Sequence, residues 1–68
     1  MDNYNSTEVV EIRRLRGLVR EHGGEVYEPR TPFRPFSVRP GGKNPAYACY
    51  EHPDLLTVLR EAAKGEGW

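Results

Sequence analysis

The chain of 68 residues is long enough for one small domain only, since a chain of this size buries about 60% of its unfolded surface. Its mean hydropathy of -0.76, with no apolar run near the roughly 20 residues that cross a bilayer, excludes a membrane-spanning protein. The start MDNYNSTEVV lacks the features of a secretory signal, and the single cysteine, Cys49, excludes an internal disulfide. We therefore expect one cytoplasmic domain over residues 1–68, with loose ends at 1–5 and 66–68.

The formal net charge is zero, but the charges are unevenly distributed. The first twelve residues carry a net charge of -3, residues 13–43 carry +5, and residues 44–68 carry -2. Eight of the ten basic residues are arginine, which is typical of surfaces that bind phosphate or carboxylate, although codon usage in a GC-rich genome gives the same preference. The middle of the chain is therefore the candidate binding region.

The first predicted element is a helix that begins after a capping box and ends at Gly23. Asn5 and Glu8, three residues apart, match that box, and EVVEIRRLRGLVREHGG continues in helical spacing to the glycine. One stripe of this helix collects the residues suited to face a core, which are Ile12, Leu15, Leu18, Val19 and His22.

Three arginines lie beside that stripe. Arg13, Arg16 and Arg20 fall within roughly 60° of one another on a helix, and we call them the arginine row. No Asp or Glu lies three or four positions from any of them, so pairing within the helix cannot neutralise them. Arg14 differs, because Glu11 precedes it by three residues. We therefore expect the arginine row to be available to a partner.

The middle of the chain predicts short strands. EVYEP is typical of a strand that ends at Pro29, and the segment 29–40 after it is rich in proline and arginine. Because proline removes backbone donors, we expect this segment to be polyproline-like or an edge strand and not a central one, with FSVR best able to pair. GGKNP, Gly41 to Pro45, is a turn cluster, and AYACYE behind it has strand character, so a hairpin is expected.

The last predicted element is a helix within HPDLLTVLREAAKG. Pro53 suits its first position, Asp54 its first turn, and Gly65 its end. Its apolar face contains Leu55, Leu56, Leu59, Ala62 and Ala63. The element order predicts a small α+β domain, αββα or αβββα, with a two- or three-stranded antiparallel sheet and both helices on one sheet face.

The second face of such a sheet has no helix to cover it. Five aromatic residues are too many to fit between one sheet and two short helices, so we expect some of them to be exposed unless proline-rich loops cover them: Tyr27, Phe33, Phe36, Tyr47 and Tyr50.

The element order resembles that of double-stranded-RNA-binding-like folds, including the small HicA-type ribonuclease toxins. The resemblance lies in the order of helices and strands along the chain and not in sequence motifs. Those toxins carry a histidine on the second strand, whereas the matching region FRPFSV has none, and the glycine and lysine pattern that opens the last helix of double-stranded-RNA-binding domains is absent. The resemblance therefore implies a layout, and no catalytic residue is transferred.

Enzymatic chemistry would have to use Cys49, His52 and His22 as a thiol nucleophile or zinc ligands. A structural zinc usually has four ligands in paired spacing, and only one such pair is present. A cysteine on a strand is more often a small buried residue, and His52 suits a position that caps the second helix. The glycine pairs lack the spacing of a phosphate loop. We predict no enzyme, catalytic residue, cofactor or metal, and keep a small ribonuclease-like toxin as the least favoured alternative.

Binding is the remaining class of function, in two versions. The predicted partner-binding residues are Arg13, Arg16, Arg20, Arg30, Phe33, Arg34, Phe36, Arg39 and Tyr47. Because such residue types are enriched at interface centres and the chain is neutral, we predict a protein-binding module, of the kind that phages and mobile elements use to inhibit or adapt a host or cognate protein. The alternative is nucleic acid, held by arginines and stacked aromatics, against which a pI near 6.7 argues.

Overall fold

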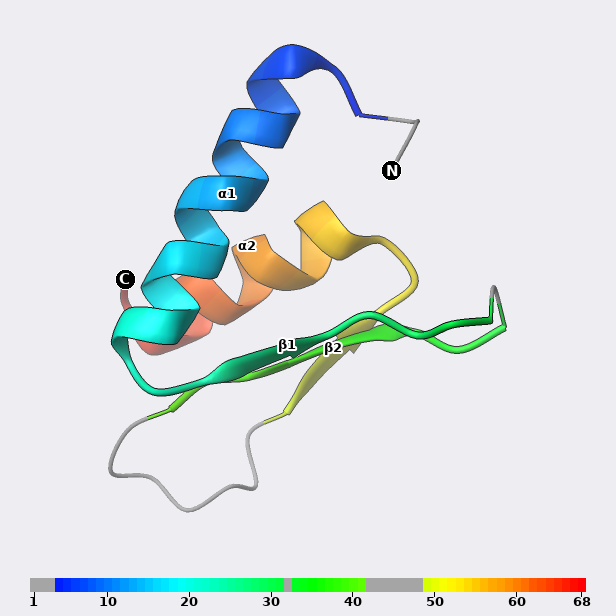
Figure 1. The fold of residues 1–68 in the computed structure, drawn as a ribbon. Helices are drawn as coiled ribbons and strands as arrows, with labels where there is room; N and C mark the ends of the chain where they lie inside the picture. The colour runs from blue at the N-terminus through cyan, green and yellow to red at the C-terminus, as the bar shows by residue number, and fades with distance from the viewer. Residues whose placement is uncertain (1–3, 32, 42–48) are drawn as a thin grey trace.

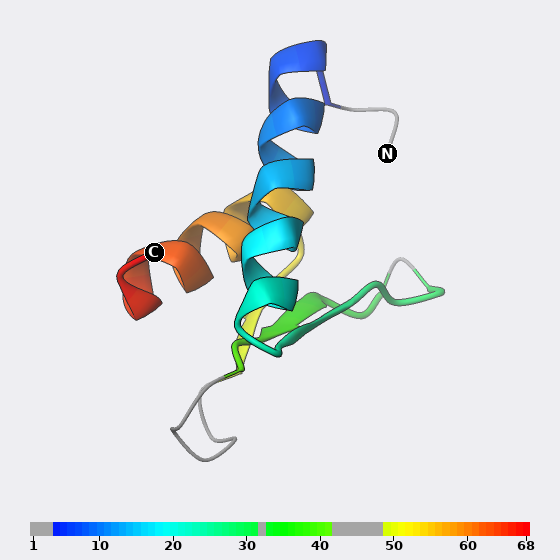
Figure 2. The same ribbon diagram turned by 60° about the vertical axis from the view of Figure 1, so that its left-hand side comes forward.

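The computed structural model describes residues 4–31, 33–41 and 49–68. In chain order the elements are α1 Ser6–Glu21, β1 Glu25–Tyr27, β2 Phe36–Arg39, β3 Tyr50–His52 and α2 Leu55–Glu66. The strands form one antiparallel sheet in the order β1-β2-β3. Both helices lie on one side of this sheet and cross each other there, as Figures 1 and 2 show. The predicted small α+β domain is confirmed.

α1 begins and ends where its sequence signals predict. The Asn5 side chain accepts a hydrogen bond from the backbone N–H of Glu8 at 2.9 Å, and the Glu8 carboxylate accepts one from Asn5 N–H at 3.1 Å. At the other end Gly23 is left-handed with φ 77°, and the N–H of Gly24 donates to the carbonyl of Val19 at 2.8 Å. Local hydrogen bonds therefore fix both ends of the helix that carries the arginine row.

β2 is the central strand, which corrects the prediction that the segment 29–40 forms an edge and not a central strand. Pro35 and Pro40 flank β2 and do not lie within it, so the four residues of the strand keep their backbone donors. Val38 lies opposite Val26 of β1 on one side and opposite Tyr50 of β3 on the other. The prolines therefore set the ends of the strand without preventing pairing on either side.

α2 starts and ends later than predicted. Asp54 is its N-cap and accepts a hydrogen bond from Thr57 N–H at 2.9 Å, so Pro53 lies outside the helix. The helix continues through Gly65 and ends at Gly67, which is left-handed with φ 76°. A Cβ atom at Gly65 would overlap the phenol ring of Tyr50. Gly65 therefore serves the close approach of α2 to β3 and does not stop the helix.

The hydrophobic core lies between the helices and the sheet. Eight of its members come from α1 and α2 and one from β2, and none is more than 4% exposed: Ile12, Leu15, Val19, Val38, Leu55, Leu56, Val58, Leu59 and Ala62. Tyr4 and Trp68, from near the two chain ends, pack against this cluster. Both ends were predicted to be loose, and the structure shows contacts with the core at Tyr4 and Trp68, whereas residues 1–3 lie outside the described residues.

An ion pair joins the exposed sides of the two helices. The guanidinium of Arg60 in α2 donates to both carboxylate oxygens of Glu11 in α1, at 2.7 and 2.8 Å. These hydrogen bonds lower the pKa of Glu11. The nearest cation to Glu11 therefore belongs to the other helix, although Arg14 follows Glu11 at helical spacing.

Candidate binding site

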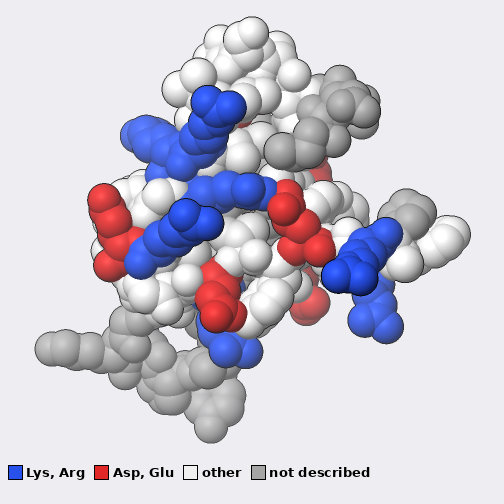
Figure 3. All heavy atoms as spheres, viewed as in Figure 1, with Lys and Arg blue, Asp and Glu red and all other residues white. Residues whose placement is uncertain are grey.

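Two residues of the arginine row on α1 are exposed to solvent. Arg13 and Arg20 are exposed, and neither forms an ion pair with any residue that the structure describes. Figure 3 shows basic side chains gathered over α1, with acidic side chains around them. Arg13 and Arg20 are therefore exposed without an ion-pair partner among the described residues, and their role in binding stays a prediction.

Arg16, the middle residue of the row, is different. Its Nη2 donates to the carboxylate of Glu28, which follows β1. This ion pair corrects the expectation that all three arginines are free of carboxylates, because Glu28 is too far along the sequence to be found by helical spacing. The Nε of Arg16 is buried and has no hydrogen-bond partner among the described residues. Arg16 thus has one partner within the fold at Nη2 and none among the described residues at Nε.

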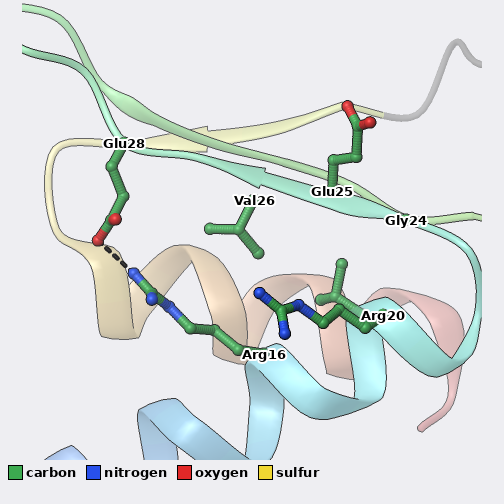
Figure 4. Close-up of a pocket in the computed structure, with 7 residues that line it drawn as sticks. Arg16, Arg20, Gly24, Glu25, Val26 and Glu28 are labelled. Atoms are coloured by element: carbon green, nitrogen blue, oxygen red, sulfur yellow. Dashed lines mark hydrogen bonds and ion pairs between the residues drawn. The ribbon is translucent and has the colours of Figure 1, made fainter.

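A groove of about 360 Å³ runs between α1 and β1. In Figure 4, Arg16 and Arg20 extend from α1 under β1, Val26 points from β1 toward them, and Glu28 closes one end by pairing with Arg16. Glu25 points to the other side of the sheet. The groove therefore combines a small apolar surface with two guanidinium groups, one of which has no carboxylate partner. We call it the α1–β1 groove.

The sheet face opposite the helices carries a second set of polar and aromatic groups. The guanidinium carbon of Arg39 lies 5.9 Å from the ring centroid of Tyr27, within the range of a cation–π contact. The Tyr27 hydroxyl donates to the Glu25 carboxylate, which raises the pKa of Tyr27. Tyr27 is 45% exposed, so the predicted exposure of some aromatics is confirmed. Arg39 is thus placed on a different face from the arginine row.

The connection between β1 and β2 carries another part of the predicted site. Arg30, Phe33 and Arg34 are exposed, and Phe33 is 93% exposed. Phe36 is half-buried and packs against the core, so it is a structural residue and not a free stacking surface. Tyr47 lies outside the described residues.

The structure does not bring all predicted site residues into one patch. Arg16 and Arg20 of the arginine row line the α1–β1 groove, whereas Arg13 is exposed on α1 outside it. Arg39 lies on the opposite sheet face, and Arg30 and Arg34 lie in the connection between β1 and β2. Sequence reasoning missed Val26 and Glu28 as parts of the groove. The alternation of EVYE, which puts Val26 on the face opposite Glu25 and Tyr27, was the available signal for Val26.

The residues considered for catalysis lie in separate environments. Cys49 is exposed, contrary to the interpretation of it as a buried strand residue. The Nδ1 atom of His52 accepts a hydrogen bond from Asp54 N–H at 2.9 Å, which places His52 at the start of α2. His22 stacks on Trp68 with ring centroids 4.4 Å apart. Within residues 4–31, 33–41 and 49–68, no group of three or more His, Cys, Asp or Glu is placed to hold a metal ion.

Comparison with models of known protein families, with curated proteins and with solved structures finds no match for this chain. In the part of the chain that the structure describes, neither helix has both the length and the apolar character needed to cross a bilayer.

Proposed function

We propose that this chain is a small protein-binding module without enzymatic activity. It recognises an acidic surface of a host or cognate protein through Arg13, Arg20 and the α1–β1 groove, and it acts as an adaptor or inhibitor of that protein. The observation that carries this proposal is the absence of an ion pair at Arg13 and Arg20 among the described residues, although the chain contains as many acidic as basic residues.

The energetics of ion pairs support this choice. Exposed arginines gain little from surface pairing within one chain, about 0.2–1 kcal/mol for each pair, so their clustering on one helix has little value for folding. At an interface the same groups are desolvated and donate to carboxylates in fixed geometry, where arginine is enriched and energetically dominant. A neutral chain also avoids the nonspecific attraction to long polyanions that a strongly basic domain would have.

Capture of partners from a cell lysate, with nuclease treatment and mass spectrometry, tests the proposal. We expect the wild-type chain to retain an acidic protein and the double variant Arg13→Glu, Arg20→Glu to lose it. The matched control is Arg14→Glu with Lys64→Glu, because both positions are exposed and the change in net charge is the same. Equal capture by both double variants would contradict the proposal, provided that circular dichroism shows both to be folded.

Nucleic-acid binding is a second candidate, favoured by one observation. Phe33 is 93% exposed and lies between the exposed arginines Arg30 and Arg34, an arrangement suited to stacking on a single-stranded base beside its phosphates. Mobility shifts with labelled DNA and RNA oligomers at low salt test it. A shift that Phe33→Ala removes would support this candidate, and no shift at micromolar protein would exclude it.

A further inference from the structure

The outer edge of β1 has no partner strand among the described residues. The sheet order places β1 at one edge, where it pairs with β2 alone. The backbone N–H and C=O groups on its outer side are therefore free to bind an extended chain, which is the basis of recognition by strand addition. The α1–β1 groove borders this strand, because Val26 lines it.

The groove also contains an unsatisfied donor. The Nε of Arg16 is buried without a hydrogen-bond partner among the described residues, and Arg20 lies beside Arg16 along the groove (Figure 4). A buried donor without an acceptor is unfavourable, so this part of the fold is not fully satisfied by its own residues. A carboxylate is the ligand that fits, because it accepts charge-assisted hydrogen bonds from a guanidinium group, and Arg20 has no carboxylate partner among the described residues.

We infer that an extended acidic segment of the partner protein adds to β1 as a fourth strand and places one carboxylate in the α1–β1 groove. This inference rests on the proposed function and specifies its partner. Side chains alternate across a strand, so every second residue of the segment faces α1 and carries the acidic groups.

Peptide titration followed by NMR tests the inference. The probe is a capped peptide of about six residues, a usual strand length, in which glutamate alternates with threonine. We expect chemical-shift changes and slower amide exchange at Glu25–Tyr27. We also expect affinity at least about tenfold above that of the same peptide with lysine in place of glutamate.

Two comparisons separate strand addition from simple charge attraction. The amides of alternate residues in a strand point to the same edge, so one peptide carries N-methyl groups on its threonine amides and a second carries them on its glutamate amides. Both keep the charge of the probe, and we expect the affinity of one of the two to fall by about tenfold. On the protein side, Arg20→Gln is expected to weaken binding about tenfold. Arg14→Gln, an exposed arginine of the same helix that does not line the groove, is expected to leave binding unchanged.

The outcomes distinguish this inference from the proposed function. If both N-methylated peptides bind as well as the probe, or amides of β1 remain unprotected, strand addition is overturned while an acidic partner on the arginine row is still supported. The same conclusion follows if no peptide shifts any resonance at about 1 mM, the range of the weakest specific affinities, while capture of a partner still depends on Arg13 and Arg20. If that capture is also independent of both arginines, the inference and the proposed function fail together.

Discussion

The hydroxyl of Tyr4 donates a hydrogen bond to Oδ1 of Asp54 at 2.5 Å. Tyr4 precedes the N-cap of α1, and Asp54 is the N-cap of α2, so this contact joins the starts of two helices that are far apart in sequence. The other carboxylate oxygen, Oδ2, accepts from Thr57 N–H at 2.9 Å and from the Thr57 hydroxyl at 2.7 Å. One carboxylate therefore caps α2 and positions the chain that enters α1.

Replacing Asp54 by asparagine should destabilise the domain in a manner that depends on pH. The hydrogen bonds from Tyr4 and Thr57 hold the pKa of Asp54 below its usual range, so its carboxylate stabilises the fold above the unfolded pKa of about 3.9. This contribution is lost as the pH falls through the lower, folded pKa. Because asparagine is also a good N-cap, we expect a loss of about 1 kcal/mol at neutral pH.

Urea unfolding at pH 7 and near pH 3 measures this difference. The gap between wild type and Asp54→Asn should be largest at pH 7 and shrink toward the acidic pH. Glu61→Gln removes an exposed carboxylate from the same helix and serves as the control, for which no such gap is expected. A gap for Asp54→Asn that is equal at both pH values would show that ionised Asp54 is not the stabilising form.

Replacement of Gly17 and of Gly24 by alanine should change the stability of the domain in opposite directions. A Cβ at Gly24 would lie 2.7 Å from the backbone nitrogen of Gly41 and closer still to the carbonyl oxygen of Arg39, so Gly24→Ala should destabilise by about 1–3 kcal/mol. A Cβ at Gly17 in α1 meets nothing within 4 Å, so Gly17→Ala should stabilise by about 0.5–1 kcal/mol through helix propensity. Thermal unfolding of both variants is the measurement. A Gly24→Ala protein as stable as wild type would contradict the close packing of this turn on β2.

Signals that act within a few residues predicted the structure well. The capping box at Asn5 and the stop at Gly23 are confirmed, because each depends on local hydrogen bonds. Of the predicted core-facing stripe, Ile12, Leu15 and Val19 are buried, Leu18 is half-buried, and His22, predicted to face the core, is exposed. The layout followed from the order of these elements.

Errors arose where a contact distant in sequence decides the outcome. Gly65 lies within α2, where the Tyr50 ring leaves no room for a Cβ atom. Arg16 forms an ion pair with Glu28, which comes close to α1 only because β1 follows that helix in the fold. Neither contact joins residues three or four positions apart, so the helical pattern of the sequence does not predict it. The role of the candidate residues stays a prediction. The sequence places Arg13, Arg16 and Arg20 on one helix, but the separation of Arg39, Arg30 and Arg34 from them depends on the fold.

Removing the Trp68 side chain should destabilise the domain, because the end of the chain is part of the packed structure. The indole stacks on the His22 ring with 15° between the planes, and the backbone N–H of Trp68, which alanine would retain, donates to the Ala63 carbonyl at 2.8 Å. An aromatic pair adds about 0.5–1.5 kcal/mol, and in a domain of this size 1 kcal/mol corresponds to about 4–8 °C in Tm. We expect Trp68→Ala to lower Tm by several degrees.

A double-mutant cycle with His22→Ala isolates the stacking energy, because the two variants share this contact. Trp68 is the single tryptophan, so its fluorescence reports docking in His22→Ala directly. We expect a coupling energy of about 0.5–1.5 kcal/mol, and additive effects would mean that the two rings do not interact in solution.

The two phenylalanines should separate binding from folding. Phe36 packs against the core, and replacement by alanine should cost about 2 kcal/mol or more. Phe33 is 93% exposed, so Phe33→Ala should change stability by less than about 0.5 kcal/mol. Any loss of ligand binding in Phe33→Ala would then report a direct contact with the ligand. Urea unfolding of both variants checks the first part, and a marked destabilisation by Phe33→Ala would show that this side chain packs against the protein in solution.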